Sequence, residues 1–242
     1  MRDTKPLMRP RSFVVLCFLA AAALAVLIGL GTWQMQRLHW KQDLIARVSS
    51  RVNEAPVALP PAGWPALDLA QWEYRPVNVQ GTFRHDLEAR VYTLLSDARG
   101  ALSGPGYWIM TPLETGEGRV LVNRGFVPLE NDTPVAKPEG LMTVAGLLRA
   151  PEGRNPFTPD DEPAKRLFFA RAPEPIAEAI GIPLAPFTID ALETPPGGLP
   201  QAGETRLTFP NRHLEYALTW YGLAAALLAV FAAFTLSRLR RR

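Results

Sequence analysis

Hydrophobic and polar positions divide the chain into two uninterrupted apolar runs and a long mixed region between them. Residues 13–32 and residues 216–237 contain no Asp, Glu, Lys or Arg. At a rise of about 1.5 Å per residue, each run is long enough as a helix to cross a hydrocarbon core of about 30 Å. We therefore predict a two-span α-helical membrane hairpin, with transmembrane helices at residues 13–32 and 213–237.

The region between the runs alternates between apolar and polar residues in short stretches, which is typical of strands. The chain also contains 24 prolines, which break long helices. One short helix is expected at Glu174–Gly181, where a glycine can end it. Residues 33–212 are thus predicted to form a β-rich α+β domain with mostly antiparallel strands. The expected strands are "RPVNVQGTF", "RVYTLL", a hairpin of "GYWIMTPLE" and "RVLVNRGFV" around "TGEG", "LMTVAGLL" and "APFTID".

Charge gives the expected orientation. The two tails, residues 1–12 and 238–242, contain eight basic residues and one acidic residue, Asp3. The rest of the chain has 18 basic and 22 acidic residues. Basic segments that flank a transmembrane helix usually lie on the cytoplasmic side of the membrane. Both tails are therefore predicted to be cytoplasmic and the domain at residues 33–212 periplasmic. No transit peptide is expected before the first run, which favours a bacterial inner membrane. The mildly acidic domain argues against nucleic acid as a partner.

Few residues suit catalysis. The only cysteine, Cys17, lies inside the first apolar run, so the outer domain can form no disulfide, Cys-x-x-Cys centre or covalent c-type haem link. The three histidines have no metal-ligand spacing, and no Gly-x-Ser-x-Gly elbow is present. His85-Asp86 is interpreted as a polar pair in a loop. We therefore predict that the protein is not an enzyme.

Three segments are more constrained than a generic strand domain requires. They are "EYRPV" (73–77), "LVNRGFVP" (121–128) and the proline-rich "NPFTPDDEP" (155–163). The favoured interpretation is structural, with buried Asn and Arg side chains satisfying backbone groups. Contact with a ligand is the alternative.

Both apolar runs carry aromatic and basic residues at the predicted outer boundary of the membrane. In "GTWQMQRLHWK" (31–41), Trp33, Arg37 and Trp40 are spaced to share a helix face. In "NRHLEYALTWYGLA" (211–224), His213 and Trp220 share another face, and Asn211 is the expected N-cap. Since one run exits where the other enters, the two clusters can meet. An ordinary interfacial belt of Trp and Tyr is the alternative reading.

These motifs resemble, in order, those of the surfeit-locus-1 family of cytochrome c oxidase assembly proteins. The resemblance rests on "GTWQMQRLHWK", "EYRPVNVQGTF", "GYWIMTP", "LVNRGFVP", "NPFTPDDEP", "PGG…GETR" and "NRHLEYALTWYGL". It implies a non-catalytic assembly factor for haem-copper terminal oxidases that holds haem a for insertion into oxidase subunit I. The implied partners are oxidase subunit I, the haem a synthesis machinery and the lipid bilayer.

The resemblance also implies site residues. His213 matches the family's histidine in the second span, and a neutral imidazole is a good axial ligand of haem iron. Trp220 is expected to flank the porphyrin edge and Arg37 to pair with a propionate.

Two rival hypotheses remain. A pure scaffold would bind oxidase subunits without haem, and His213→Ala would then leave its function intact. A membrane-anchored enzyme would turn over a substrate, but the sequence offers no nucleophile and base for it.

Overall fold

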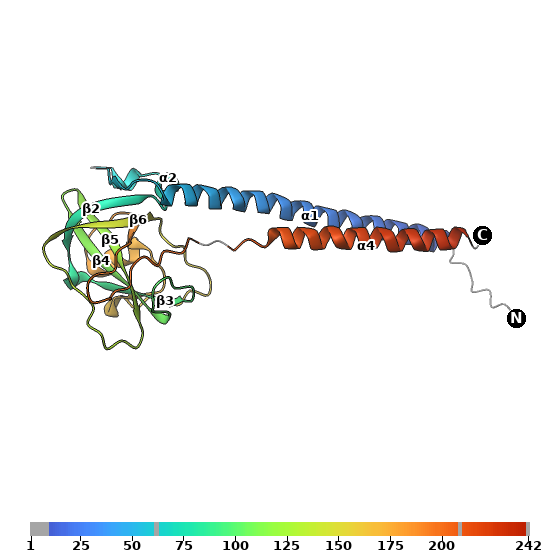
Figure 1. The fold of residues 1–242 in the computed structure, drawn as a ribbon. Helices are drawn as coiled ribbons and strands as arrows, with labels where there is room; N and C mark the ends of the chain where they lie inside the picture. The colour runs from blue at the N-terminus through green and yellow to red at the C-terminus, as the bar shows by residue number, and fades with distance from the viewer. Residues whose placement is uncertain (1–9, 61–62, 208–209, 241–242) are drawn as a thin grey trace. The chain divides into compact units, whose positions relative to one another are not determined.

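The computed structural model describes residues 10–60, 63–207 and 210–240 and divides into two compact units. A helical unit contains the chain up to Arg47 and the chain from Thr208 onward, and a β unit contains Val48–Leu207. In chain order the elements are α1 (Pro10–Val52), β1 (Val57–Ala58), η1 (Trp64–Ala66), α2 (Leu69–Trp72), β2 (Pro76–Phe83), η2 (His85–Leu87), β3 (Ala89–Leu95), β4 (Gly104–Thr115), β5 (Gly118–Pro128), β6 (Leu141–Arg149), η3 (Pro163–Lys165), β7 (Leu167–Phe168), α3 (Pro173–Ile180), β8 (Thr188–Ala191) and α4 (His213–Leu239) (Figure 1).

The helical unit contains α1 as far as Arg47 and the whole of α4, which run side by side in opposite directions (Figure 1). Both helices are long and apolar enough to cross a membrane, judged by length and composition. The predicted spans, residues 13–32 and 213–237, lie inside these helices. Helix α1 continues without a break from Thr32 to Val52, so residues 33–52, which the sequence assigned to the outer domain, are helical. The limits of the spans themselves stay a prediction.

The β unit is built around a closed barrel of five strands. Strands β2, β6, β8, β5 and β4 pair in that order, and β4 returns to pair with β2 through Thr82↔Glu114 and Phe83↔Leu113. At this closing seam Gly81 lies so close that an added Cβ would be 2.4 Å from the carbonyl oxygen of Glu114. A glycine is therefore required there for the two strands to meet.

The barrel interior is apolar because alternate residues of each strand point inward. In β2 the buried positions alternate with exposed ones from Val77 to Phe83. The largest buried cluster comprises Trp64, Val77, Val79, Phe83, Leu113, Val120, Val122, Val144, Leu148, Ala185, Phe187 and Ile189. This core supplies the ordinary apolar stabilisation that a domain without disulfides needs.

Outside the barrel, β3 extends the sheet from β4, and β7 pairs with β3 in parallel. Helix α3 packs on a second buried cluster that includes Met110, Phe168 and Ile176. Pro173 starts this helix and Gly181, at φ 73°, caps its end. The predicted helix at Glu174–Gly181 is confirmed.

The predicted strands and the hairpin are also confirmed, with β4 and β5 flanking the expected turn. The expectation of one short helix was incomplete, since α2 is a second one capped by Asp68. Most strand pairs are antiparallel, whereas β1–β2, β5–β8 and β3–β7 are parallel. Closure into a barrel was not predicted, because the β2–β4 pairing joins residues that are far apart in the chain.

Candidate functional site

Helices α1 and α4 contact one another near both ends of α4. At one end the rings of Phe13 and Phe234 stack with centroids 6.5 Å apart. At the other end the His213 ring meets Gln34, with Nδ1 2.7 Å from the amide oxygen Oε1. The two boundary motifs predicted from the sequence therefore do meet, through a residue that the sequence did not single out.

The contact with Gln34 indicates which ring nitrogen of His213 carries the proton. An amide oxygen can only accept a hydrogen bond, so Nδ1 carries the proton and donates to Gln34. In the neutral ring the other nitrogen, Nε2, then keeps its lone pair. His213 is half-buried at the start of α4. Its backbone N–H donates to Asn211 Oδ1 at 3.3 Å, while the N-cap residue is Arg212 rather than the predicted Asn211.

Tyr221 holds the two helices close together near this contact. Its ring lies over Gly31, where an added Cβ would be 2.6 Å from the Tyr221 ring carbon Cε1. Its hydroxyl lies 3.2 Å from the Thr32 hydroxyl, which itself donates to the Ile28 carbonyl. On α4, Ala217 is fully buried one turn after His213. Small residues thus permit a close approach of the helices, which fixes their register.

The predicted site residues fall into two groups. Trp220 is half-buried on the same helix as His213, two turns further along. Arg37 instead lies between two rings of its own helix, with its guanidinium carbon 5.9 Å from the Trp33 centroid and 5.3 Å from the Trp40 centroid. Trp33 and Trp40 are about half exposed, at 49% and 51%. The structure therefore joins His213 to α1 through Gln34 and places Arg37 in an exposed aromatic stack.

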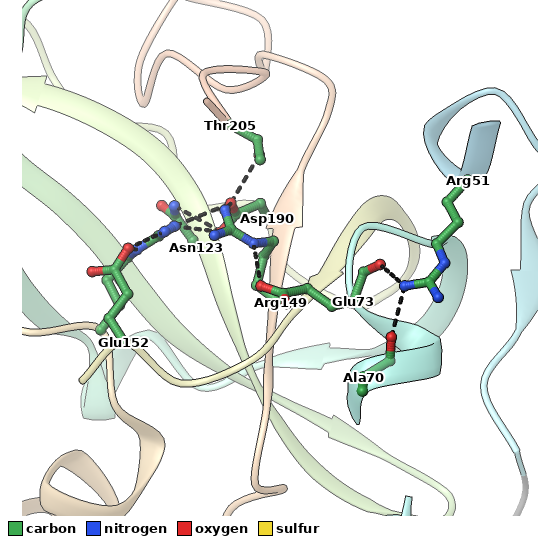
Figure 2. A network of polar contacts seen from close by, with 9 residues as sticks. Arg51, Ala70, Glu73, Asn123, Arg149, Glu152, Asp190 and Thr205 are labelled. Atoms are coloured by element: carbon green, nitrogen blue, oxygen red, sulfur yellow. Dashed lines mark hydrogen bonds and ion pairs between the residues drawn. The ribbon is translucent and has the colours of Figure 1, made fainter. Parts of the chain in front are cut away.

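The β unit contains a buried polar network centred on Asp190 of β8 (Figure 2). Asp190 is 2% exposed and accepts hydrogen bonds from Asn123, Arg149, Arg171 and Thr205. These donors come from β5, β6, the segment before α3 and the segment after β8. The network therefore joins strands and loops that are distant in the sequence.

Electrostatics keep this carboxylate ionised. Burial alone would raise the pKa of Asp190, but Arg171 and Arg149, together with the Thr205 and Asn123 hydrogen bonds, lower it below its usual value. Burial likewise opposes the charge on Arg171, whereas Asp190 and Glu152 raise the pKa of that guanidinium. Each buried charge is thus compensated by an opposite charge at hydrogen-bonding distance.

The network continues toward the end of α1 (Figure 2). Arg149 Nε lies 3.7 Å from the Glu73 carboxylate, and its guanidinium covers the Tyr74 ring at 4.5 Å. Arg51, in the last turn of α1, donates to the carbonyl oxygens of Ala70 and Glu73. Glu73 and Tyr74 of the "EYRPV" motif therefore link the barrel network to the last turn of α1, whereas the motif's own Arg75 is half-buried and pairs with Glu54 at 3.1 Å.

The "LVNRGFVP" motif is also structural. Asn123 donates to Asp190 and accepts from the Gly125 backbone N–H. Arg124 is buried, donates to Glu88 at 3.0 Å and to the carbonyl oxygen of Ala136, and has a pKa lowered by burial. These contacts support the buried Asn and Arg roles expected from the sequence. His85 lies beside them, with Nε2 2.9 Å from the carbonyl oxygen of Pro138.

The third motif, "NPFTPDDEP", forms an ordered loop that exposes an aromatic ring. Asn155 Oδ1 accepts from the Phe157 N–H, and Arg154 pairs with Asp161 at 2.7 Å. Asp161 also accepts from the Phe169 N–H, which fixes the base of the loop to the strand region of β7. Phe157 is nonetheless 92% exposed.

Neither Gln34 nor Asp190 was identified as a candidate from the sequence. Gln34 lies inside the quoted "GTWQMQRLHWK" stretch, but its partner is 179 positions away. Asp190 ends the predicted strand "APFTID", where it reads as an ordinary polar residue at the end of a strand. Among the described residues, no group of three or more His, Cys, Asp and Glu side chains could hold a metal ion.

A family model described as the SURF1 family matches residues 21–225. The chain is 37% identical to Surfeit locus protein 1 of Rattus norvegicus over 217 residues, which cover 84% of this chain and 70% of the rat protein. It is 40% identical to Surfeit locus protein 1 of Homo sapiens over 216 residues, which cover 82% of this chain and 70% of the human protein.

The chain belongs to the SURF1 family. Members of this family are known as cytochrome c oxidase assembly factors. A SURF1-like protein of Drosophila melanogaster is also similar, at 36% identity over 221 residues that cover 84% of this chain and 71% of the fly protein. The matched region contains both halves of the helix contact, Gln34 and His213, and the whole network around Asp190.

Proposed function

We propose that this protein is a membrane-bound assembly factor for a haem-copper terminal oxidase that holds haem a for insertion into subunit I. Family membership supports the role in oxidase assembly. The hydrogen bond between His213 and Gln34 is the observation that supports haem binding, because a proton on Nδ1 leaves the lone pair of Nε2 available to iron. Oxidase subunit I and the haem a synthesis machinery are the proposed partners.

The proposed membrane arrangement is a hairpin of two spans, residues 13–32 and 213–237. It is supported by large apolar side chains that point outward along both helices, such as Phe18 and Val230. A helix that is apolar on its outer faces is stable in lipid rather than in water. With basic tails at both ends, we place both termini in the cytoplasm, the domain at residues 33–212 in the periplasm and the hairpin in a bacterial inner membrane.

The residues at the helix contact fit a haem group. Histidine ligands of metals usually donate their second ring N–H to an acceptor, and His213 makes such a bond to Gln34. Haem a would supply the iron, and His213 would be the single side chain of this chain that holds it. We propose that Trp220 flanks the macrocycle and that Arg37, held between Trp33 and Trp40, pairs with a propionate. A single ligand suits a carrier that must release its haem.

We further propose that the protein is not an enzyme. Buried ionisable groups of the β unit have partners within the fold: Asp190 pairs with Arg171, Arg124 pairs with Glu88, and Glu204 accepts from the backbone N–H groups of Arg99 and Gly100. These partners account for the burial of the charged groups, so no catalytic role is needed to explain it.

The decisive experiment is an absorbance spectrum of the detergent-purified full chain from cells that make haem a. We expect a haem a band in the wild type and in His39→Ala, because His39 is an exposed histidine on α1. We expect the band to be lost in His213→Ala. Haem retained by His213→Ala would move the ligand elsewhere, and absence of haem from every preparation would contradict the carrier function.

The scaffold function remains the second candidate, and exposed apolar side chains of the β unit favour it. Phe157 is almost fully exposed, and Tyr92 and Leu94 project from the outward face of β3. Exposed aromatic side chains are typical of protein interfaces. A protein that supports oxidase assembly equally well with His213→Ala would be a scaffold.

A further inference from the structure

We propose that Gln34 is a positioning residue that fixes the His213 tautomer and limits how strongly this ligand holds iron. The proposal deepens the haem-binding function proposed above and rests on it for its second part. Its first part, the tautomer of His213, can be tested on the protein without haem.

The tautomer follows from the acceptor. A neutral histidine side chain in water carries its proton mainly on Nε2, which would block iron binding through that atom. At 2.7 Å the Gln34 oxygen forms a short, direct hydrogen bond with Nδ1 and draws the proton to that side of the ring. The lone pair on Nε2 then faces away from Gln34 and is available to a metal.

The orientation of the ring follows from helix pairing. Gln34 is half-buried one turn after Gly31, over which Tyr221 packs. The hydroxyls of Thr32 and Tyr221 meet at 3.2 Å in the same region. Since donor and acceptor lie on different helices, the ring is oriented only when α1 and α4 are paired. Pairing of the helices therefore controls whether the His213 ring is oriented to bind iron.

The strength of the ligand follows from the charge of the acceptor. Many metal-bound histidines donate to a carboxylate, which increases the electron density on the ligating nitrogen. Gln34 offers a neutral amide oxygen at the same place, so His213 remains a weaker ligand. A neutral acceptor combines correct orientation with easy release, which a haem carrier requires.

The first test is nitrogen NMR of the haem-free full chain labelled with ¹⁵N-histidine. We expect His213 to be protonated on Nδ1 and His85 on Nε2, because the His85 nitrogen Nε2 faces the Pro138 carbonyl and provides an internal reference. The spectrum of His213→Ala assigns the signal. Gln34→Leu should convert His213 to the Nε2-protonated form, whereas Gln36→Leu, an exposed glutamine on the same helix, should not.

A wild-type His213 protonated on Nε2, or a tautomer unchanged by Gln34→Leu, would overturn the proposal. This result does not depend on haem. If His213 has the expected tautomer but no preparation binds haem, the carrier function fails while the assignment of Gln34 stands.

The second test uses the haem-loaded protein. We expect Gln34→Leu to weaken haem binding by about 10- to 100-fold, as is usual when the hydrogen-bond partner of a metal ligand is lost. Gln34→Glu should slow haem release and lower the reduction potential of the iron, while Gln36→Leu should match the wild type. Equal affinities and potentials in all three variants would show that Gln34 does not position the ligand.

Discussion

The two units of this protein differ in how completely their central polar side chains are hydrogen-bonded. In the β unit, Asp190 receives hydrogen bonds from four side chains, and two arginines compensate its charge. In the helical unit, the His213 ring is hydrogen-bonded to Gln34 through Nδ1, and no partner of its Nε2 is found among the described residues. Asp190 is thus surrounded by donors from the fold, whereas the His213 ring is hydrogen-bonded at one nitrogen, which is the basis of its proposed role as a ligand.

This difference indicates where structure and function reside. A buried carboxylate that accepts from four side chains stabilises one arrangement of strands and loops. A half-buried imidazole that is hydrogen-bonded at one nitrogen is oriented, and its other nitrogen can still act as a ligand. The motifs "EYRPV" and "LVNRGFVP" therefore maintain the barrel, and the helix-boundary motifs carry the proposed chemistry.

The largest effect is expected for Asp190→Asn. Removing this charge leaves Arg149 and Arg171 buried with less compensation, which should lower the free energy of unfolding by about 3–5 kcal/mol. Chemical denaturation of the full chain in detergent, followed by tryptophan fluorescence, measures the change. Asp160→Asn, at an exposed position of the loop, should change stability by less than about 0.5 kcal/mol.

The same variant should also change the response to acid. Because the folded pKa of Asp190 is lowered, its contribution is complete above the pKa of an unfolded aspartate, about 3.9. The contribution is lost as the pH falls through the lower folded pKa. The wild type should therefore lose stability more steeply below about pH 4 than Asp190→Asn does. Equal slopes would show that the network is not charged.

A smaller effect is expected for Gly31→Leu in the helical unit. The new side chain would collide with Tyr221, which we expect to destabilise the helix pair by about 1–3 kcal/mol. Thiol cross-linking between Phe13→Cys and Phe234→Cys, in a Cys17→Ser background, reports helix pairing, and its yield should fall. Gly29→Leu is the matched control, because nothing lies within 4 Å of a Cβ there.

The smallest effect on stability is expected for Phe157→Ala. Its ring is exposed, so the free energy of unfolding should change by less than about 0.5 kcal/mol, whereas Phe187→Ala in the barrel core should cost about 3–5 kcal/mol. The same denaturation experiment compares them. A loss of oxidase activity in Phe157→Ala at unchanged haem content would assign this loop to partner binding and extend function into the β unit.

Several elements could be predicted because their signals are local. The β4–β5 hairpin combines two apolar strands with a short turn, and α3 ends at a glycine in the left-handed conformation. The two long helices follow from uninterrupted apolar runs. The end of α1 could not be predicted, because residues 33–52 lack such a run and continue the helix with mixed polarity.

Half of the candidate site was also accessible to sequence reasoning. His213 was identified through its place at the start of the second apolar run and through the family resemblance. Gln34 was not identified, because nothing in the sequence around this glutamine indicates that its partner is a histidine on the other helix. Arg37 was identified, but its contact with Trp33 and Trp40 is a feature of a single helix and follows from their spacing.

The sequence by itself determined the two apolar helices, the strands and their turns, and the family. These depend on periodicity, capping and order of motifs, which are properties of neighbouring residues. Only the tertiary structure decided the closure of β2 on β4, the gathering of donors around Asp190, the fit of Tyr221 over Gly31 and the bond between Gln34 and His213. Each of these joins distant residues, and such contacts depend on packing and loop closure, which no local pattern specifies.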